Sequence, residues 1–123
     1  MKVLIVDDSS FAISMIRKVV ESMEGYEVVG EAKDGRSAYK QAQNLNPDII
    51  TLDNILPDTI GTKLIKPLKK LDPDVKILMI SAIQQATVTQ EAIDLGADDY
   101  LVKPFQDREL IEALTDLKVN IGW

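Results

Sequence analysis

The stretch VLIVDDSS, residues 3–10, decides the fold, because four consecutive apolar residues lead directly into two adjacent aspartates. A short, continuous apolar run predicts a strand that is covered on both faces, as strands are in a parallel sheet. Two carboxylates are costly beside such a strand unless cations or hydrogen-bond donors compensate them. The stretch therefore predicts a parallel strand that carries Asp7 and Asp8 to a polar edge of the sheet.

The rest of the chain alternates between strand-like and helix-like patterns. Four more strands are predicted at residues 26–31, 49–52, 77–80 and 100–102, and five helices at 12–23, 35–45, 61–71, 86–95 and 106–118. Five successive βα units indicate an α/β fold with a doubly wound parallel sheet between two helical layers. Residues 1–123 are expected to form one domain. Pro67 falls inside the third helical pattern and is expected to kink that helix or delay its start.

The composition narrows the chemistry that the chain can perform. The chain has a formal net charge of −6 at pH 7 and contains neither cysteine nor histidine. Disulfides, thiol chemistry and histidine catalysis are therefore excluded, and any metal site must use oxygen ligands, which suit a hard cation. The negative charge argues against direct binding to nucleic acid or to an anionic membrane. No run approaches the roughly 18 apolar residues of a membrane span and no signal peptide is visible, so a cytoplasmic protein is expected.

Polar side chains follow four of the five predicted strands. Asp7 and Asp8 follow the first strand, Asp53 the third, Ser81 the fourth and Lys103 the fifth. Ligands of open parallel sheets bind at the carboxyl ends of the strands, so these residues are expected to meet in one crevice. Three close carboxylates repel one another, so either their pKa values rise or a cation occupies the site, and Mg²⁺ suits carboxylates combined with phosphate oxygens. A carboxylate can accept a phosphoryl group while lysine and metal neutralise its charge, so the set predicts Mg²⁺-dependent formation of an aspartyl-phosphate.

Each of these residues, taken singly, also has a plainer explanation. An aspartate pair between a strand and a helix usually caps the helix, a role open to Asp8 or Ser9. Asp53 alone would be read as a turn residue, Ser81 as a cap and Lys103 as a solvated charge. Their joint occurrence at four strand ends is much rarer by chance than any one of them. The combination therefore favours a functional site.

Four motifs resemble those of the response-regulator receiver domain family, and in particular its CheY-like members. They are LIVDDS at 4–9, PDIITLDNILPDTIG at 47–61, ILMISA at 77–82 and GADDYLVKPF at 96–105. The resemblance extends over essentially the whole chain, and the motifs are specific in their order and spacing. It implies a flavodoxin-like (βα)5 fold with the strand order 2-1-3-4-5, which is the order of CheY itself.

The resemblance also implies a role for each matching residue at the strand ends. Asp53 matches the phosphoacceptor, and Asp7 and Asp8 match the acidic pair that holds Mg²⁺ together with it. Ile55 matches the position whose backbone carbonyl completes the metal site. Lys103 matches the lysine that contacts the phosphoryl oxygens.

Three further positions match residues that change conformation on phosphorylation in this family, or that lie next to the phosphoryl-binding lysine. Ser81 matches the residue that moves toward the phosphoryl group, and Tyr100 matches the aromatic residue that turns inward when Ser81 moves. Pro104 matches a proline that is usually preceded by a cis peptide bond. The resemblance thus implies a phosphoacceptor and switch, not an enzyme that acts on other molecules.

The phosphodonor and the downstream partner must be other proteins. The resemblance implies a histidine kinase as donor. Because this chain contains no histidine, the phosphohistidine must belong to another protein. Residues 77–102 include no lysine or arginine, unlike receivers that dimerise through basic residues there, so a monomer is expected. Few residues follow the last predicted helix, which favours a stand-alone protein, and the resemblance to chemotaxis regulators implies the flagellar motor switch as its target. A receiver domain excised from a multidomain response regulator, with transcriptional or enzymatic output, stays an alternative.

Two other classes of protein fit the residues less well. A Mg²⁺-dependent aspartyl-phosphate phosphatase commonly needs an Asp-x-Asp pair, whereas Asp53 is followed by Asn54 and Ile55. A flavodoxin-like cofactor binder needs a phosphate-binding loop rich in glycine, serine or threonine after the first strand. This chain has Asp7 and Asp8 at that place and no glycine.

Overall fold

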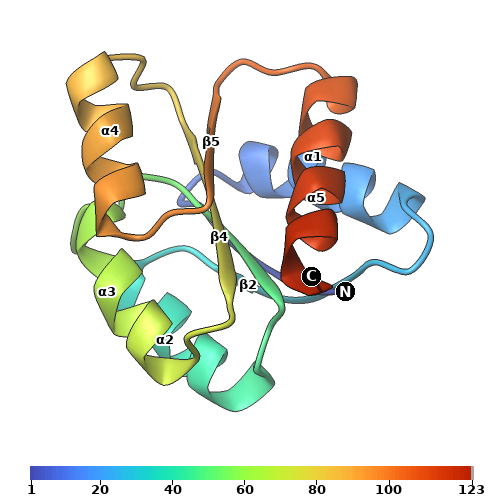
Figure 1. Ribbon diagram of the computed structural model, residues 1–123, viewed down its shortest axis with the longest axis horizontal. Coiled ribbons are helices and arrows are strands. Elements are labelled where there is room, and N and C mark those ends of the chain that lie inside the picture. The colour runs from blue at the N-terminus through green and yellow to red at the C-terminus, as the bar shows by residue number, and fades with distance from the viewer. Residues whose placement is uncertain (123) are drawn as a thin grey trace.

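Strands and helices alternate along the chain in the computed structural model, which describes residues 1–122, with side chains as far as Leu117 (Figure 1). The strands are β1 (Lys2–Val6), β2 (Glu27–Ala32), β3 (Ile49–Leu52), β4 (Lys76–Ser81) and β5 (Asp99–Val102). The helices are α1 (Ser10–Ser22), α2 (Gly35–Leu45), α3 (Thr62–Leu71), α4 (Ala86–Leu95) and α5 (Asp107–Gly122). Every predicted element is present.

The predicted ends of the elements agree with the structure within two residues, except at the end of α5. The prediction of residue 118 as the last helical residue is wrong, because α5 continues to Gly122. Val119, Asn120 and Ile121 are weaker helix formers, but none of them stops a helix as proline does. Trp123, the last residue of the expected tail, lies outside the described residues.

The five strands form one parallel sheet in the order β2-β1-β3-β4-β5, which confirms the predicted flavodoxin-like α/β fold. Val6 at the end of β1 pairs with Leu52 at the end of β3. The backbone N–H of Asp53 then donates to the carbonyl of Val6 at 3.0 Å. The residues that follow these two strands, Asp7 and Asp53, therefore start their loops side by side.

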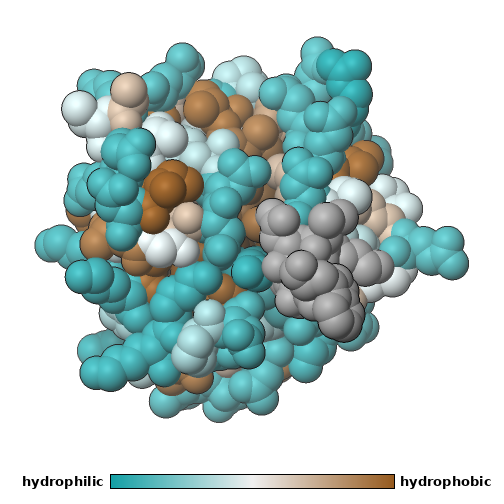
Figure 2. All heavy atoms as spheres, in the orientation of Figure 1, coloured by the Kyte–Doolittle hydropathy of each residue, from teal (hydrophilic) through white to brown (hydrophobic). Residues whose placement is uncertain are grey.

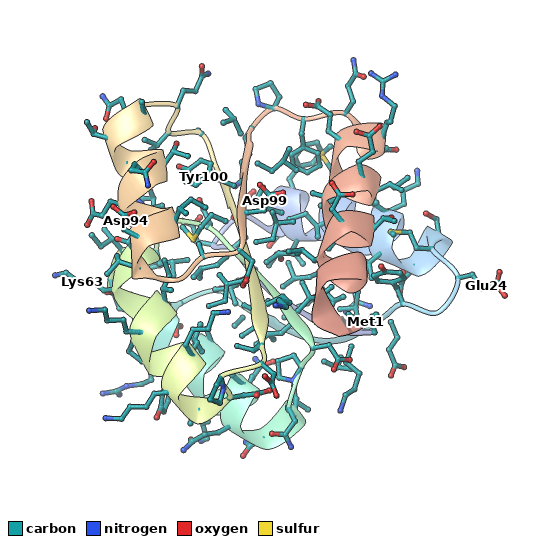
Figure 3. The ribbon with its side chains drawn as sticks, viewed as in Figure 1. Met1, Glu24, Lys63, Asp94, Asp99 and Tyr100 are labelled. Carbon is teal, nitrogen blue, oxygen red and sulfur yellow. The ribbon has the colours of Figure 1, made fainter. Side chains whose placement is uncertain are left out.

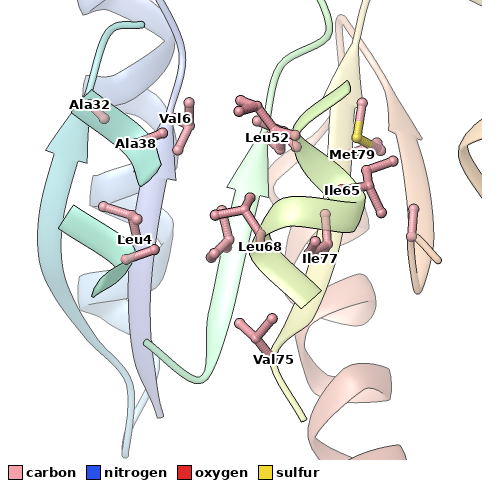
Figure 4. Close-up of a cluster of buried hydrophobic side chains, with 14 of the residues drawn as sticks. Leu4, Val6, Ala32, Ala38, Leu52, Ile65, Leu68, Val75, Ile77 and Met79 are labelled. Atoms are coloured by element: carbon pink, nitrogen blue, oxygen red, sulfur yellow. The ribbon is translucent and has the colours of Figure 1, made fainter. Parts of the chain in front are cut away.

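Two helical layers cover the sheet (Figure 1). Helices α1 and α5 pack together on one face, and α2, α3 and α4 lie next to one another on the other face. Side chains of β1 alternate between these layers. Leu4 and Val6 belong to the buried cluster in Figure 4, whereas Val3 and Ile5 belong to the cluster under α1 and α5. This burial on both faces explains the continuous apolar runs of the strands.

The first two helices begin at side-chain caps. The Ala12 N–H donates to Ser9 Oγ at 3.2 Å, and the Ser37 N–H donates to Asp34 Oδ1 at 2.7 Å. The Ser9 N–H itself donates to Asp7 Oδ1 at 2.9 Å. Ser9, not Asp8, is therefore the capping residue of α1, so the cap and the acidic pair coexist in one loop.

Helix α3 runs through Pro67 without a delayed start. It begins at Thr62, next to the predicted residue 61, and buries Thr62, Leu64, Ile65 and Leu68. Pro67 has no N–H to donate to the carbonyl of Lys63, but its side chain lies on the exposed side of the helix. Water can satisfy that carbonyl there. Burial of the opposite side explains why the helix persists across the proline.

Polar residues cover most of the surface in Figure 2, with small apolar patches between them. Among the described helices, none is both long enough and apolar enough to span a membrane.

Candidate functional site

The three predicted acidic residues meet at the carboxyl ends of β1 and β3. Asp7, Asp8 and Asp53 each place a carboxylate oxygen within 4.8 Å of the oxygens of the other two. Asp7 and Asp53 are buried, with exposed fractions of 1% and 7%, whereas Asp8 is exposed. The group thus has a buried floor and one carboxylate at its open side.

Lys103 joins the same group from the end of β5. Its Nζ lies 2.6 Å from Asp7 Oδ2 and 3.5 Å from Asp53 Oδ2. The backbone N–H of Lys103 donates to the Ser81 carbonyl at 2.9 Å, which ties this loop to the end of β4. The Lys103–Pro104 peptide bond is cis, which confirms the prediction made for Pro104.

The environment of Asp53 disfavours its negative charge. Burial raises the pKa of Asp53 above its ordinary value of 3.8, and the nearby Asp7 carboxylate raises it further. The Lys103 ammonium and the backbone N–H groups of Asn54 and Ile55 act in the opposite direction. A cation between the carboxylates would relieve the repulsion, so the electrostatics of the site favour metal binding.

The donor set fits Mg²⁺. Carboxylate oxygens from three residues lie close together, and one of these residues faces solvent, where a hydrated ion can enter. Mg²⁺ keeps several water ligands and is commonly held by one or two carboxylates with phosphate oxygens. When bound, it would neutralise charge on a transferring phosphoryl group. The role of the Ile55 carbonyl stays a prediction; the Ile55 side chain is 56% exposed.

Ser81 and Tyr100 lie on the side of the site formed by β4 and β5. Ser81 is buried, and its Oγ accepts a hydrogen bond from the Ile83 N–H at 3.3 Å. The hydroxyl of Tyr100 donates to the Ile83 carbonyl at 2.8 Å. Tyr100 is half-buried and packs against the core cluster on the α2–α4 side, between β5 and α4 in Figure 3. Both predicted switch residues therefore contact the same residue of the β4–α4 loop.

The loop after Asp53 folds back on itself as a small hairpin. Ile55 and Ile60 form an antiparallel bridge, and the Leu56 N–H donates to the Thr59 carbonyl at 3.2 Å. The Gly61 N–H donates to the Asn54 carbonyl at 2.7 Å. We call residues 53–61 the acceptor loop.

Sequence reasoning missed two residues that hold the acceptor loop in place. Asn54 Oδ1 accepts the Thr62 N–H at 3.1 Å and so caps α3, whose preceding residue Gly61 makes no side-chain cap. Asp58 accepts hydrogen bonds from the first residues of α2. The usual cap signal stands directly before a helix, so Asn54, which lies eight residues before Thr62, could not be recognised as a cap. Likewise, nothing near Asp58 in sequence points to a helix that begins 23 residues earlier.

Comparisons with known proteins agree with this geometry. Residues 3–115 match the response regulator receiver domain family, and the chain belongs to that family. The chemotaxis protein CheY of Thermotoga maritima is 44% identical over 113 residues, which cover 92% of this chain and 93% of that protein. The chain is thus a CheY-like receiver, a phosphoacceptor switch.

Solved structures show the same fold. The response regulator domain of Thermotoga maritima CheB matches with a TM-score of 0.88 and 30% identity, over 100% of this chain and 97% of that one. A CheY from Borrelia burgdorferi, in a complex with CheX, BeF3 and Mg²⁺, matches with a TM-score of 0.90 and 28% identity, over 96% and 89% of the two chains. The Mg²⁺ in that relative agrees with the acidic site found here.

Proposed function

We propose that Asp53 accepts a phosphoryl group from a phosphohistidine of a histidine kinase, and that the modified chain then binds a downstream protein. The observation that carries this proposal is the group formed by three carboxylates and Lys103 around Asp53. Residues 1–123 act together as one receiver unit in the cytoplasm.

The residues divide the transfer between them. One carboxylate oxygen of Asp53 forms the new O–P bond while the N–P bond to the donor imidazole breaks, and the imidazole nitrogen keeps the electron pair of that bond. Asp7, Asp8 and Asp53 would hold Mg²⁺, with the Ile55 carbonyl as a further ligand. The Lys103 ammonium, now 2.6 Å from Asp7, also contacts a phosphoryl oxygen. These positive charges offset the negative charge of the transferred group.

Movements of Ser81 and Tyr100 transmit the phosphorylation of Asp53 to the surface of the protein. The Ser81 hydroxyl moves toward the phosphoryl oxygens and gives up its contact with Ile83. Tyr100 follows inward, and the surface of α4, β5 and α5 changes. A protein of the flagellar motor switch reads that surface, since the chemotaxis relatives give the strongest support for a role in chemotaxis.

An apolar hollow beside the site offers a place for the donor protein. It is lined by Phe11, Ala12, Met15, Ala82, Lys103, Pro104 and Phe105. Phe11 is 75% exposed, so its ring is available to a partner at this hollow. The kinase domain that carries the phosphohistidine covers this hollow as it approaches Asp53.

Phosphorylation by a small donor tests the proposal directly. The chain is incubated with acetyl phosphate and Mg²⁺, and its intact mass is measured. Wild type gains one phosphoryl group, whereas Asp53→Asn gains none and Asp8→Ala gains it more slowly. Ser81→Ala gains the group but no longer changes its affinity for a partner that recognises the phosphorylated wild type.

The same experiment separates this function from its alternatives. A mass gain that persists in Asp53→Asn, or that needs no divalent cation, would contradict the proposal. Sustained turnover of phosphorylated small molecules would instead identify a phosphatase.

A further inference from the structure

The tip of the acceptor loop is fastened to the start of helix α2. Asp58 Oδ1 accepts the Gly35 N–H at 2.7 Å, and Asp58 Oδ2 accepts the Arg36 N–H at 3.0 Å. These N–H groups are among the first of the helix, which have no partners within the helix itself. One carboxylate thus joins the acceptor loop to the start of α2, two segments that are separated along the chain by the rest of α2 and by β3.

Helix α2 does not need Asp58 in order to begin. Asp34 already caps it locally, since its Oδ1 accepts the Ser37 N–H at 2.7 Å. A second carboxylate at the same helix start is favourable because the helix dipole places partial positive charge there. The two backbone hydrogen bonds accordingly hold the pKa of Asp58 below its ordinary value. The contact therefore serves to place the loop rather than to start the helix.

Close packing at this point also depends on glycine. A Cβ on Gly35 would lie 2.5 Å from Thr59 Cγ2, so a larger residue here would force the Thr59 side chain or the loop to shift. At the other end of the loop, a Cβ on Gly61 would meet the Asp53 carbonyl oxygen. The acceptor loop is thus held at its base near Asp53 and at its tip by Asp58.

We propose that Asp58 is a positioning residue for the phosphorylation site: its bridge to Gly35 and Arg36 fixes the acceptor loop, and so the placement of Asp53 and Ile55 for Mg²⁺. This inference rests on the proposed function of Asp53. Without the bridge, the hairpin between Ile55 and Ile60 keeps the buried side chain of Leu56 as an anchor, but its tip loses both hydrogen bonds to α2. The loop then samples more positions, and ordering it costs part of the metal-binding free energy.

Mg²⁺ titration of matched variants tests the inference. In Asp58→Ala, the Kd of Mg²⁺ measured by titration calorimetry rises about tenfold, as it does when groups that orient metal ligands are removed. Phosphorylation by acetyl phosphate slows at low Mg²⁺ and recovers at saturating Mg²⁺. Asp58→Asn keeps one acceptor oxygen and recovers part of the affinity, and it replaces Asp58→Ala if the latter fails to fold.

The control is Asp34→Ala, which removes the other cap at the start of α2. It lowers the unfolding temperature, as loss of a cap does, but leaves the Mg²⁺ affinity at the wild-type value. Wild-type affinity in both Asp58 variants, or an equal loss in Asp34→Ala, would overturn the inference. Failure of wild type itself to gain a phosphoryl group would count against the proposed function of Asp53 instead.

Discussion

At the scale of single residues, the site gathers charges that a purely structural core would avoid. Asp7 and Asp53 are both buried and repel each other, and the ammonium of Lys103 lies close to both.

Thr51 is a buried polar residue without a role in this site. Its Oγ1 is buried on β3 and has no hydrogen-bond partner among the described residues.

Replacing Thr51 with valine is expected to stabilise the protein. The two side chains have nearly the same shape, and valine removes a buried hydroxyl that the fold leaves unpaired. The free energy of unfolding, measured by urea denaturation, should rise by about 1 kcal/mol. The control Thr115→Val removes a hydroxyl that donates to the Ile111 carbonyl at 2.7 Å on the exposed face of α5, and should bring no gain. A loss of stability in Thr51→Val would show that its hydroxyl has a partner, such as a water molecule.

At the scale of elements, helix α3 combines a strong apolar face with an interior proline. The apolar residues at 64, 65 and 68 are buried, and Asn54 supplies the cap from outside the helix. Lys69 in its last turn donates to Asp98 at 2.8 Å and to the Val75 carbonyl at 2.6 Å, which fastens the helix to the far end of the sheet. These contacts compensate for the hydrogen bond that Pro67 cannot make.

Replacing Pro67 with alanine should therefore stabilise α3. Alanine restores an N–H donor to the carbonyl of Lys63 and removes the steric conflict of the ring with the preceding turn. Thermal and urea unfolding should show a gain of about 1–3 kcal/mol. The neighbouring exposed position offers a control, since Lys66→Ala should change the stability by less than about 0.5 kcal/mol. An unchanged or lower stability in Pro67→Ala would mean that the proline's restriction of the unfolded chain outweighs its cost in the helix.

The sequence predicted the features that depend on neighbouring residues, such as the strands and the residues that follow them. It did not predict contacts between segments that lie far apart in the chain. The apolar runs and the residues directly after them located the strands, and the shared edge of a parallel sheet then brought Asp7, Asp53 and Lys103 together. The contacts of Asp58 with Gly35, and of Lys69 with Asp98, join segments more than 20 residues apart. No periodicity or motif in either segment specifies its partner. The delayed start that Pro67 could have caused is not seen, because burial of the apolar side of α3 outweighs the low helix propensity of proline; the kink stays a prediction.

At the scale of the whole molecule, the charges of the candidate site and the stability of the fold are coupled. Burial and Asp7 raise the pKa of Asp53, so the folded state binds a proton at Asp53 more readily than the unfolded state does. This contribution favours the folded state at low pH and is lost as the pH rises through the raised pKa. At neutral pH, without a metal ion, the Asp53 carboxylate therefore opposes folding.

Thermal unfolding with and without Mg²⁺ should reveal this coupling. Without metal at pH 7, Asp53→Asn should unfold at a higher temperature than wild type, because it removes the repelled charge. With Mg²⁺ at about 100 times its Kd, wild type should gain about 2.7 kcal/mol, and Asp53→Asn should gain less. Asp116→Asn, which makes the same charge change on the exposed side of α5, serves as the control and should respond to Mg²⁺ like wild type. A wild type that is more stable than Asp53→Asn without metal would contradict the electrostatic account.

The contact of Asp7 with Lys103 across the sheet also sets the order in which the charges of the site come together during synthesis. The ribosome makes β1 and its two aspartates first, then Asp53, and Lys103 only with the last strand. At about 5–20 residues per second, the stretch from Asp53 to Lys103 takes about 3–10 s to synthesise. During that interval the emerging chain carries all three carboxylates but lacks the ammonium that completes the site. We therefore expect that a chain interrupted before Lys103 cannot form this arrangement of charges.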